Sequence, residues 1–567
     1  MRAICLLSSA AILACSSGGS ATHKVGDACK TSQDCGNLLR CYTDATPSIC
    51  TNACGDSSTC SAGSACAPLL SSLGSGLCLL TCTSNASCGT GYTCCEALGN
   101  VCAPASKCTG TVPVDTGSTL QCAPRTIVNG GRLGPAQQPA LCLKPVTPVA
   151  FAGAQVQAFG AHLVGDEVSF NVPAGTGTIS IVEQVIDGGA PDQITLNNAR
   201  LPNTVVPFHV TAPDGGVFYN DDVQPNLDLS TMEVVYSSQT AAVGAMTLPN
   251  TTLALSHLAQ GGYPAGTWTM QVNDYAYECF RGDSTTHGCT TLQNTQSYDL
   301  QVVTKPVMGD TGTVDIGIYL ISTNWTAGIA IADANGDWTR FLDTLAGIYA
   351  NAGLCLGKVT FYDPPSWAKN AYSTSVDATD LTPCGVLDQM FTLSQPGGEV
   401  PVFFVDDIKA AGTQGSGQVI VGIDGSIPGP AGAGGTVHSG AVVNVADLST
   451  TGCGANPQFT SCGADEIAYI VAHEGGHFMG LYHTTESNGS LFDPIGDTSQ
   501  CAPGCDANLD GILVGSECKD DSSTTLSCGG ASDLMFWLLS PQAKGLISPQ
   551  QARVMRASPV VYRGSGQ

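Results

Sequence analysis

His473-Glu474-Gly475-Gly476-His477-Phe478-Met479-Gly480-Leu481-Tyr482-His483 is the stretch of this chain that carries the most information about its fold. In a helix, His473 and His477 lie one turn apart on the same face, so both imidazoles can reach one metal ion, with Glu474 beside it as general base. Gly480 lets the chain leave the helix and turn back, so that His483 can supply a third nitrogen. Three protein ligands leave one zinc position for water, which is the catalytic arrangement. The stretch predicts a zinc site; the alternative is a core helix that carries three histidines.

The residues before the motif favour a buried helix. Asp465 and Glu466 place negative charge where the first turn would lie, and the helix dipole favours negative charge there. An apolar run follows and leads to the first histidine, as expected of a helix inside a domain. The run contains Ile467, Ile470, Val471 and Ala472.

Length and charge limit the classes of function. A chain of 567 residues is too long for one core, so three or four domains are expected. The formal net charge is -26, with only 20 Lys and Arg residues. Because no basic stripe exists to neutralise phosphates, nucleic acid is excluded as a partner. Abundant glycine (68 residues) and few charged residues (12%) suit loop-rich β domains outside the cell.

The first residues predict export. Arg2 precedes an apolar run over 3–14 that is too short to span a bilayer and resembles a signal peptide. Ile12-Leu13-Ala14-Cys15 resembles a bacterial lipobox, which implies lipidation of Cys15. We therefore expect a signal peptide at 1–15 and a tether at 16–28; the alternative is an ordinary secretory signal cut near Ala14. No later segment is long and apolar enough for a transmembrane helix.

Cysteine usage agrees with an oxidising compartment. Of the 28 cysteines, Cys5 and Cys15 belong to the leader, and the even number that is left can form disulfides. Residues 29–108 hold 14 cysteines with repeated spacings, which predicts a disulfide-rich repeat module. Zinc-ribbon spacing is lacking, and the sequence does not choose between adhesion, spacing and shielding as its role. Residues 109–145 are predicted to form a linker closed by a Cys122–Cys142 disulfide.

Residues 146–306 are predicted to form a β-sandwich. Short alternating or apolar runs are bounded there by Gly, Pro and Asp turns. Residues 266–274 resemble the closing strands of jelly-roll modules attached to secreted bacterial peptidases. We also expect a loop closed by Cys279 and Cys289, in which the Arg-Gly-Asp tripeptide at 281–283 is a chance occurrence. The expected strands include 167–172, 178–182, 205–210, 267–272 and 298–303.

Residues 307–567 alternate between strand and helix and predict an α/β domain. Residues 337–353 have the period of an amphipathic helix, and the acidic segment 333–337 is predicted to cap its N-terminus. The zinc helix follows the last expected strand, and a cysteine-rich half comes after it. The expected strands are 314–321, 359–362, 400–405, 419–423 and 441–445.

This part of the chain resembles the metzincin metallopeptidases. The extended histidine motif and the later Ser532-Asp533-Leu534-Met535-Phe536-Trp537 carry this likeness, and 480–485 with 493–498 are most similar to the pappalysin (cytophagalysin) family. The resemblance implies zinc ligands at His473, His477 and His483, a general base at Glu474, a methionine turn at Met535, and hydrolysis of peptide bonds.

The chain departs from the metzincin pattern in two ways. Trp537 stands where several metzincins carry a tyrosine, and an indole can neither coordinate zinc nor give up a phenolic proton. Asp533 and Leu534 replace the more usual residues before the turn methionine, so Met535 could also be ordinary core packing.

A second metal signal lies at 506–517, which fits a twelve-residue calcium loop. Gly511 falls at the sixth position, where the loop needs a sharp turn. Because the loop is flanked by Cys505 and Cys518 instead of two clear helices, a solvated acidic loop is the alternative. The residues that would supply oxygens are Asp506, Asn508, Asp510, Ile512 through its backbone carbonyl, and Glu517.

Together these features predict an exported, lipid-anchored zinc endopeptidase with three folded parts: disulfide-rich repeats, a β-sandwich and a metzincin-like α/β domain. Its partners would be a protein or peptide substrate and the outer-membrane lipid that holds the anchor. One alternative is a cell-surface adhesion or binding protein with a vestigial peptidase domain. Another is a zinc hydrolase that acts on something other than protein. The roughly 300 residues before the catalytic domain could also act as a pro-segment.

Overall fold

The computed structural model divides the chain into two compact units, 1–119 and 120–567, which we describe separately. Residues 1–23, which include Cys15, and the predicted Cys279–Cys289 loop lie outside the described residues. The structure describes residues 24–28, 40–42, 49–51, 53–54, 64–70, 75–82, 87–88, 92–95, 101–104, 120, 122–133, 153–186, 194–196, 199–201, 203–220, 232–235, 237–238, 243–276, 297–373, 375–378, 385–409, 421–454, 462–519, 528–539 and 543–564.

The first unit is built from short antiparallel strands and disulfides. Cys82 bonds to Cys94, and Cys88 bonds to Cys102. Disulfides of this kind hold short segments together where little hydrophobic core exists. The strands are β1 (Arg40–Tyr42), β2 (Ile49–Thr51), β3 (Ala53–Cys54), β4 (Ser64–Leu70), β5 (Ser75–Leu80), β6 (Tyr92–Cys95) and β7 (Val101–Pro104).

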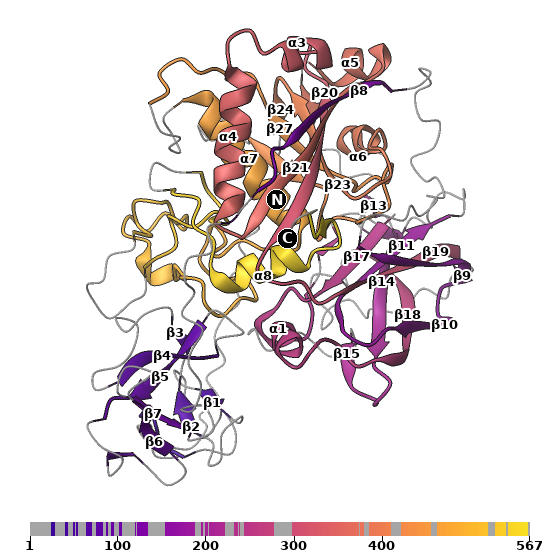
Figure 1. The fold of residues 1–567 in the computed structure, drawn as a ribbon. Coiled ribbons are helices and arrows are strands. Elements are labelled where there is room, and N and C mark those ends of the chain that lie inside the picture. The colour runs from indigo at the N-terminus through magenta and orange to yellow at the C-terminus, as the bar shows by residue number, and fades with distance from the viewer. Residues whose placement is uncertain are drawn as a thin grey trace. The chain divides into compact units, whose positions relative to one another are not determined.

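Two four-stranded antiparallel sheets form a sandwich in the second unit (Figure 1). Buried side chains from both sheets share one core, in which Trp268, Tyr298 and Ile181 are fully covered. The sheet orders are β10-β18-β14-β15 and β17-β11-β19-β9. The strands are β9 (Gln155–Leu163), β10 (Glu167–Val172), β11 (Thr176–Val185), β14 (Asn203–Thr211), β15 (Val217–Asn220), β17 (Val243–Leu248), β18 (Gly266–Ala276) and β19 (Ser297–Pro306); a hairpin of β12 (Ile194–Leu196) with β13 (Ala199–Leu201) and the helix α1 (Thr252–Ala259) complete this region.

Strand alternation explains why these segments form a sandwich. Along β10, Val168, Phe170 and Val172 are buried, and the residues between them are exposed. Period-two burial of this kind places one face of a strand on the core and the other in water. The five strands expected from the sequence in this region are all present. Helix α1 was not expected from the sequence.

Glu183 is a carboxyl group inside the sandwich, and it makes stability depend on pH. It is fully buried, neither oxygen has a partner, and burial raises the pKa of Glu183 well above its ordinary value. As pH rises above about 4.3, the unfolded chain ionises this group while the folded chain resists, so the folded state loses stability up to the raised pKa. We expect Glu183→Leu to raise the melting temperature at pH 8 by more than at pH 4. Thermal unfolding at both pH values measures this.

Glu167→Leu provides the matched control for Glu183→Leu. Glu167 is exposed on β10, so its replacement should change the melting temperature little at either pH. An equal shift of Glu183→Leu at pH 4 and pH 8 would contradict an ionisation cost at Glu183.

A seven-stranded sheet forms the centre of the rest of this unit, in the order β25-β27-β23-β20-β21-β8 with β28 paired to β20. All of its strands are parallel except β25 and β28, which run antiparallel to their neighbours. Its strands are β8 (Thr126–Arg132), β20 (Gly312–Leu320), β21 (Leu354–Asp363), β23 (Glu399–Val405), β25 (Gly422–Asp424), β27 (Ala441–Asn444) and β28 (Val561–Tyr562). Short two-stranded pairings join β22 (Val376–Asp377) to β24 (Ile408–Lys409) and β16 (Ser237–Ser238) to β26 (Ser426–Ile427).

Helices cover both faces of this sheet. Phe404 of β23 stacks on Trp338 of α4, while the next residue back, Phe403, contacts Phe391 of α6 on the opposite face. Figure 1 shows α4 and α7 side by side. The expected amphipathic helix is therefore present as α4. The helices are α3 (Ala327–Ala332), α4 (Asp337–Ala350), α5 (Ser366–Tyr372), α6 (Val386–Phe391), α7 (Gly463–Phe478), the 3₁₀ turn η8 (Pro503–Cys505) and α8 (Pro549–Ala557).

The acidic segment before α4 caps the helix, as the sequence predicts. Asp333 accepts hydrogen bonds through its two carboxylate oxygens from the backbone N–H groups of Trp338 (2.9 Å) and Thr339 (2.8 Å). These are donors that a helix leaves without intrahelical partners in its first turn.

The predicted linker over 109–145 is wrong in part. Residues 126–132 form β8, which pairs in parallel with β21 at the edge of the large sheet. Cys122 bonds to Cys355, and not to Cys142. Strand β8 is mostly exposed, so it has no apolar run that could reveal it in the sequence. A disulfide depends on two Cα atoms coming within about 7 Å, which chain spacing does not determine.

Strand β8 changes the order of the parts along the chain. The chain enters the large sheet at β8, builds the sandwich over β9 to β19, and returns to the same sheet at β20. The sandwich is thus inserted into the α/β part and does not simply precede it. In the described part of the chain, no helix has both the length and the apolar character needed to cross a bilayer.

Candidate active site

Helix α7 carries the first two histidines and is anchored at its start. The guanidinium of Arg340 on α4 donates two hydrogen bonds of 2.7 Å each to the carboxylate of Asp465, which is fully buried. Thr344, one turn further along α4, donates a third bond of 2.6 Å to the same carboxylate. This arrangement holds the first turn of α7 against α4.

Two glycines between the histidines allow close packing around the helix. A Cβ atom at Gly475 would collide with the hydroxyl of Tyr349 on α4. A Cβ atom at Gly476 would lie 2.7 Å from the sulfur of Met535. Met535 is fully buried, and its carbonyl accepts a hydrogen bond of 2.9 Å from the N–H of Thr484. The side chain of Met535 therefore packs directly against the histidine-bearing helix, where the resemblance placed a methionine turn.

The three histidines come together at the end of α7. Gly480 has φ of 104°, a conformation that favours glycine, and the chain turns back there to bring His483 to His473 and His477. The ring centroids are 4.8 Å apart for His473 and His477, 5.3 Å for His473 and His483, and 4.7 Å for His477 and His483. One ligand atom from each ring lies within 4.8 Å of the others.

Hydrogen bonds orient all three rings. The Nδ1 atom of His473 lies 2.7 Å from the carbonyl oxygen of Leu534, and that of His477 lies 2.7 Å from the carbonyl oxygen of Leu481. The Nδ1 atom of His483 lies 3.1 Å from a carboxylate oxygen of Glu486. Because carbonyl and carboxylate oxygens only accept, each Nδ1 carries the hydrogen, and each Nε2 presents a lone pair.

The lone pairs of the Nε2 atoms fit a metal ion. Nε2 of His477 lies 3.1 Å from Nε2 of His483. With both hydrogens on Nδ1, two lone pairs face each other at this distance, which is unfavourable unless a cation lies between them. Two nitrogen ligands of a tetrahedral zinc ion would be about 3.3 Å apart. Burial and, to a smaller extent, the neighbouring imidazoles lower the pKa of His473 to about 3 and that of His477 well below its ordinary value. His473 and His477 are thus neutral, as metal ligands must be.

Glu474 follows His473 on α7 and is buried against the backbone of β25. It is 6% exposed, and burial raises the pKa of Glu474 to about 8. One of its carboxylate oxygens contacts Gly422 of β25 so closely that any side chain there would collide with it. A positive charge held by the neighbouring histidines would oppose the effect of burial and favour the carboxylate form.

Asp424 is a second buried acid near Glu474. Gly422 and Asp424 are two apart on β25, so they share the face that contacts Glu474. Asp424 is 7% exposed, and one of its oxygens has no partner. Burial raises the pKa of Asp424 well above its ordinary value, and the charge of Glu474 raises it further.

The indole N–H of Trp537 bonds to the backbone of the 506–517 loop. Its Nε1–H donates a hydrogen bond of 2.8 Å to the carbonyl oxygen of Leu513. The indole therefore links the turn that contains Met535 to the end of the 506–517 loop, and it has no hydrogen left for the reaction centre.

The 506–517 loop is exposed, and its carboxylates bond to its own backbone. Its three carboxylates are not among the groups of His, Cys, Asp and Glu that converge in the described residues. Calcium binding there stays a prediction. The N–H groups of Leu509 (2.7 Å) and Gly511 (2.8 Å) donate to Asp506, that of Ile512 (2.8 Å) and the amide of Asn508 (3.0 Å) donate to Asp510, and those of Ala507 and Val514 (3.0 Å each) donate to Glu517.

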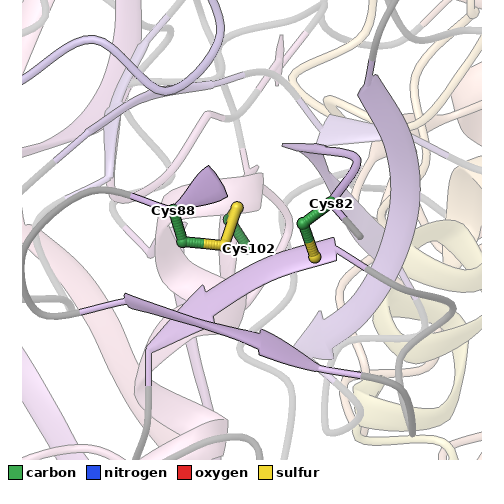
Figure 2. A group of neighbouring side chains, drawn as sticks. All are labelled: Cys82, Cys88 and Cys102. Carbon is green, nitrogen blue, oxygen red and sulfur yellow. A yellow bond between two sulfur atoms is a disulfide. The ribbon is translucent and has the colours of Figure 1, made fainter. Parts of the chain in front are cut away.

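Two other clusters of potential metal ligands are disulfides. Figure 2 shows Cys82 beside the disulfide between Cys88 and Cys102. Cys82 itself bonds to Cys94. The second cluster contains Cys453, Cys462 and Asp465, and its two cysteines are bonded to each other. Sulfur atoms in disulfides are not thiolate ligands, so neither cluster competes with the histidines as a metal site.

Sequence reasoning missed three residues around the histidines. Glu486 has a local signal, since it follows His483 by three residues and is a carboxylate that can orient a ring. Asp424 and Tyr349 have no such signal. They lie far from the motif along the chain and meet it only through the sheet and through α4.

Comparisons with known proteins add little to this geometry. No protein-family model matches the sequence, and neither does any curated protein. Among solved structures, the chain is similar to metalloproteinase-II from Bacteroides fragilis, with a TM-score of 0.23 and 11% sequence identity. The match covers 52% of this chain and 74% of that chain. A TM-score this low supports no inference about activity.

Proposed function

We propose that this chain is a zinc-dependent endopeptidase of the metzincin type, closest to the pappalysins. The observation that carries the proposal is the convergence of three imidazoles at the end of the helix that also holds the buried Glu474. His473, His477 and His483 would hold zinc through their Nε2 atoms. Met535 would form the floor beneath them.

Each residue has a defined task in peptide hydrolysis. Zinc, when bound, makes water more acidic and polarises the carbonyl that is attacked. The carboxylate of Glu474 accepts a proton from the attacking water and then delivers it to the leaving amine. Gly422 leaves room for this carboxylate, and Leu534, Leu481 and Glu486 keep the three rings in the tautomer that donates from Nδ1.

The position of β25 supports a peptide as the substrate. Among the described residues, β25 pairs within its sheet only with β27 and ends the sheet on that side. An extended peptide can add to an edge strand through backbone hydrogen bonds. Since Gly422 of β25 contacts Glu474, a peptide bound along this edge would pass close to the general base.

Zinc content and cleavage of casein test the proposal together. We expect one zinc per chain by mass spectrometry and casein cleavage that stops when zinc is chelated. His483→Ala should lose both, while His209→Ala, in the sandwich, should lose neither. Zinc without cleavage of casein would favour a binding protein with a vestigial peptidase domain or a hydrolase for another substrate.

We also propose that the protein is exported and anchored by a lipid at Cys15. The disulfides of the described residues are typical of an oxidising compartment. Cys15→Ser should release the protein from the membrane fraction without changing casein cleavage. A mature N-terminus beyond Cys15 would exclude the anchor.

Calcium is proposed as a second ion, bound by the 506–517 loop. The carboxylates of Asp506, Asp510 and Glu517 would then share a cation, and calcium would stabilise the folded state by linkage. We expect calcium at millimolar concentration to raise the melting temperature of the wild type but not that of Asp510→Ala. Thermal unfolding with and without calcium measures this, and an equal response of both proteins would exclude the site.

A further inference from the structure

Asn250, between β17 and α1, lies near the turn of the histidine motif. A Cβ atom at Gly480 would lie 3.7 Å from the Cβ of Asn250 and 3.6 Å from Val554 of α8. Asn250 is 1% exposed, and its side-chain amide bonds to both backbone polar groups of Val235. A residue of the sandwich region is therefore fixed against the glycine at which the chain turns toward His483.

Thr252, the first residue of α1, holds the segment that follows the third histidine. Its N–H donates to the carbonyl oxygen of Pro494 (3.0 Å), and its hydroxyl accepts from the N–H of Gly496 (2.7 Å). The hydroxyl also donates to the side chain of Gln550 on α8 (2.6 Å). One threonine thus links the sandwich, the segment after His483 and the C-terminal helix.

Strand β16 makes a third contact, through β26. It pairs with β26, so that Ser237 lies opposite Ile427. The carbonyl oxygen of Ile427 accepts a hydrogen bond of 3.1 Å from the hydroxyl of Tyr482, which is the residue before His483. The sandwich region therefore also supports the loop that positions Tyr482.

Two further buried contacts join the sandwich to the α/β part, one apolar and one polar. Val182 and Val243 of the sandwich share one core with Ala433 and Val437 of the α/β part. The amino group of Lys305, 1% exposed, donates to three backbone carbonyls of the C-terminal segment. Separating the two parts would expose this core and leave buried polar groups without partners, which is costly.

We infer that the β-sandwich is a permanent part of the catalytic unit and not a pro-segment that must leave for activity, with Thr252 as a positioning residue. Two observations carry this. The sandwich is inserted between β8 and β20, so after a single cut before β20 it stays tied to the α/β part through β8 and the Cys122–Cys355 disulfide. Its contacts go to Gly480, Pro494 and the loop at Ile427; among the described residues, none of its hydrogen bonds goes to Glu474 or to a histidine of the motif.

Excision of the sandwich in place tests the inference. Recognition sites for a specific protease would be inserted at 146–150 and at Gly309, where an added side chain would meet no atom within 4 Å. After cleavage without denaturant, the sandwich should co-elute with the remainder in size-exclusion chromatography, with zinc content and casein cleavage within about twofold of the uncut protein. Release of the sandwich from a remainder that keeps or gains activity would overturn the inference.

A substitution at Thr252 tests positioning directly. Thr252→Val keeps the shape of the side chain and the backbone bond to Pro494 but loses the hydroxyl's bonds to Gly496 and Gln550, so kcat should fall by roughly tenfold while zinc content stays unchanged. Thr252→Ser should restore kcat, and Thr267→Val, at an exposed position on β18, should leave it unchanged. Full kcat with a lowered melting temperature would show that Thr252 only stabilises the fold.

The inference rests on the proposed function only for the activity measurements. Co-elution and zinc content do not require peptidase activity. If the uncut protein does not cleave casein, the proposed function fails, and chromatography still decides whether the sandwich is a fixed part of this unit.

Discussion

Glu474→Gln is expected to reduce casein cleavage by about 10²–10⁴-fold while zinc stays bound, because an amide cannot accept the proton of the attacking water. The substitution keeps the size of the side chain, so its packing against Gly422 should be preserved. It also removes a carboxyl group that burial makes costly to ionise, so the melting temperature should not fall. Steady-state kinetics, zinc content and thermal unfolding measure the three effects.

Glu466→Gln is the matched control for this variant. Glu466 lies in the first turn of the same helix, α7, and is half-buried. It is two turns away from the histidines, so its replacement should leave kcat unchanged. If Glu474→Gln retained more than about a tenth of the wild-type rate, Glu474 could not be the general base.

Arg340→Ala is expected to destabilise the second unit by about 3–5 kcal/mol, because it leaves the fully buried carboxylate of Asp465 without its cationic partner. The ion pair joins α4 to the first turn of α7, so zinc should also be held more weakly. Urea unfolding and the zinc affinity of the folded protein measure the two effects.

A surface ion pair provides the comparison for Arg340→Ala. Arg125 lies 2.7 Å from Asp343, whose side chain is 53% exposed. Since water screens exposed pairs, Arg125→Ala should cost no more than about 1 kcal/mol. Equal effects of the two substitutions would mean that burial of Asp465 does not determine the strength of its ion pair.

Local patterns in the sequence were sufficient for several of the regular elements. Alternation of buried residues predicted strands such as β10, and the 3.6-residue period predicted α4. The spacing of the histidine motif predicted that His473, His477 and His483 would come together, and they do. Each of these features depends on residues that are near one another in the chain, so one sequence contains the information.

Features that depend on distant residues could not be predicted in this way. An exposed edge strand such as β8 has no apolar pattern, and the Cys122–Cys355 disulfide joins residues 233 positions apart. Asp424 and Tyr349 reach the histidine motif only because the sheet and α4 bring them there.

The sequence by itself determined the chemistry of the proposed site: three imidazoles, one carboxylate and a glycine at the turn, all within eleven residues. Only the tertiary structure decided what surrounds them, namely the insertion of the sandwich between β8 and β20, the position of Asn250 near Gly480, and the hydrogen bonds of Thr252 to the segment after His483. The physical reason is the distance along the chain over which each kind of interaction acts. Side-chain chemistry and helical period act over a few residues, whereas strand pairing and burial depend on which distant surfaces the whole chain brings into contact.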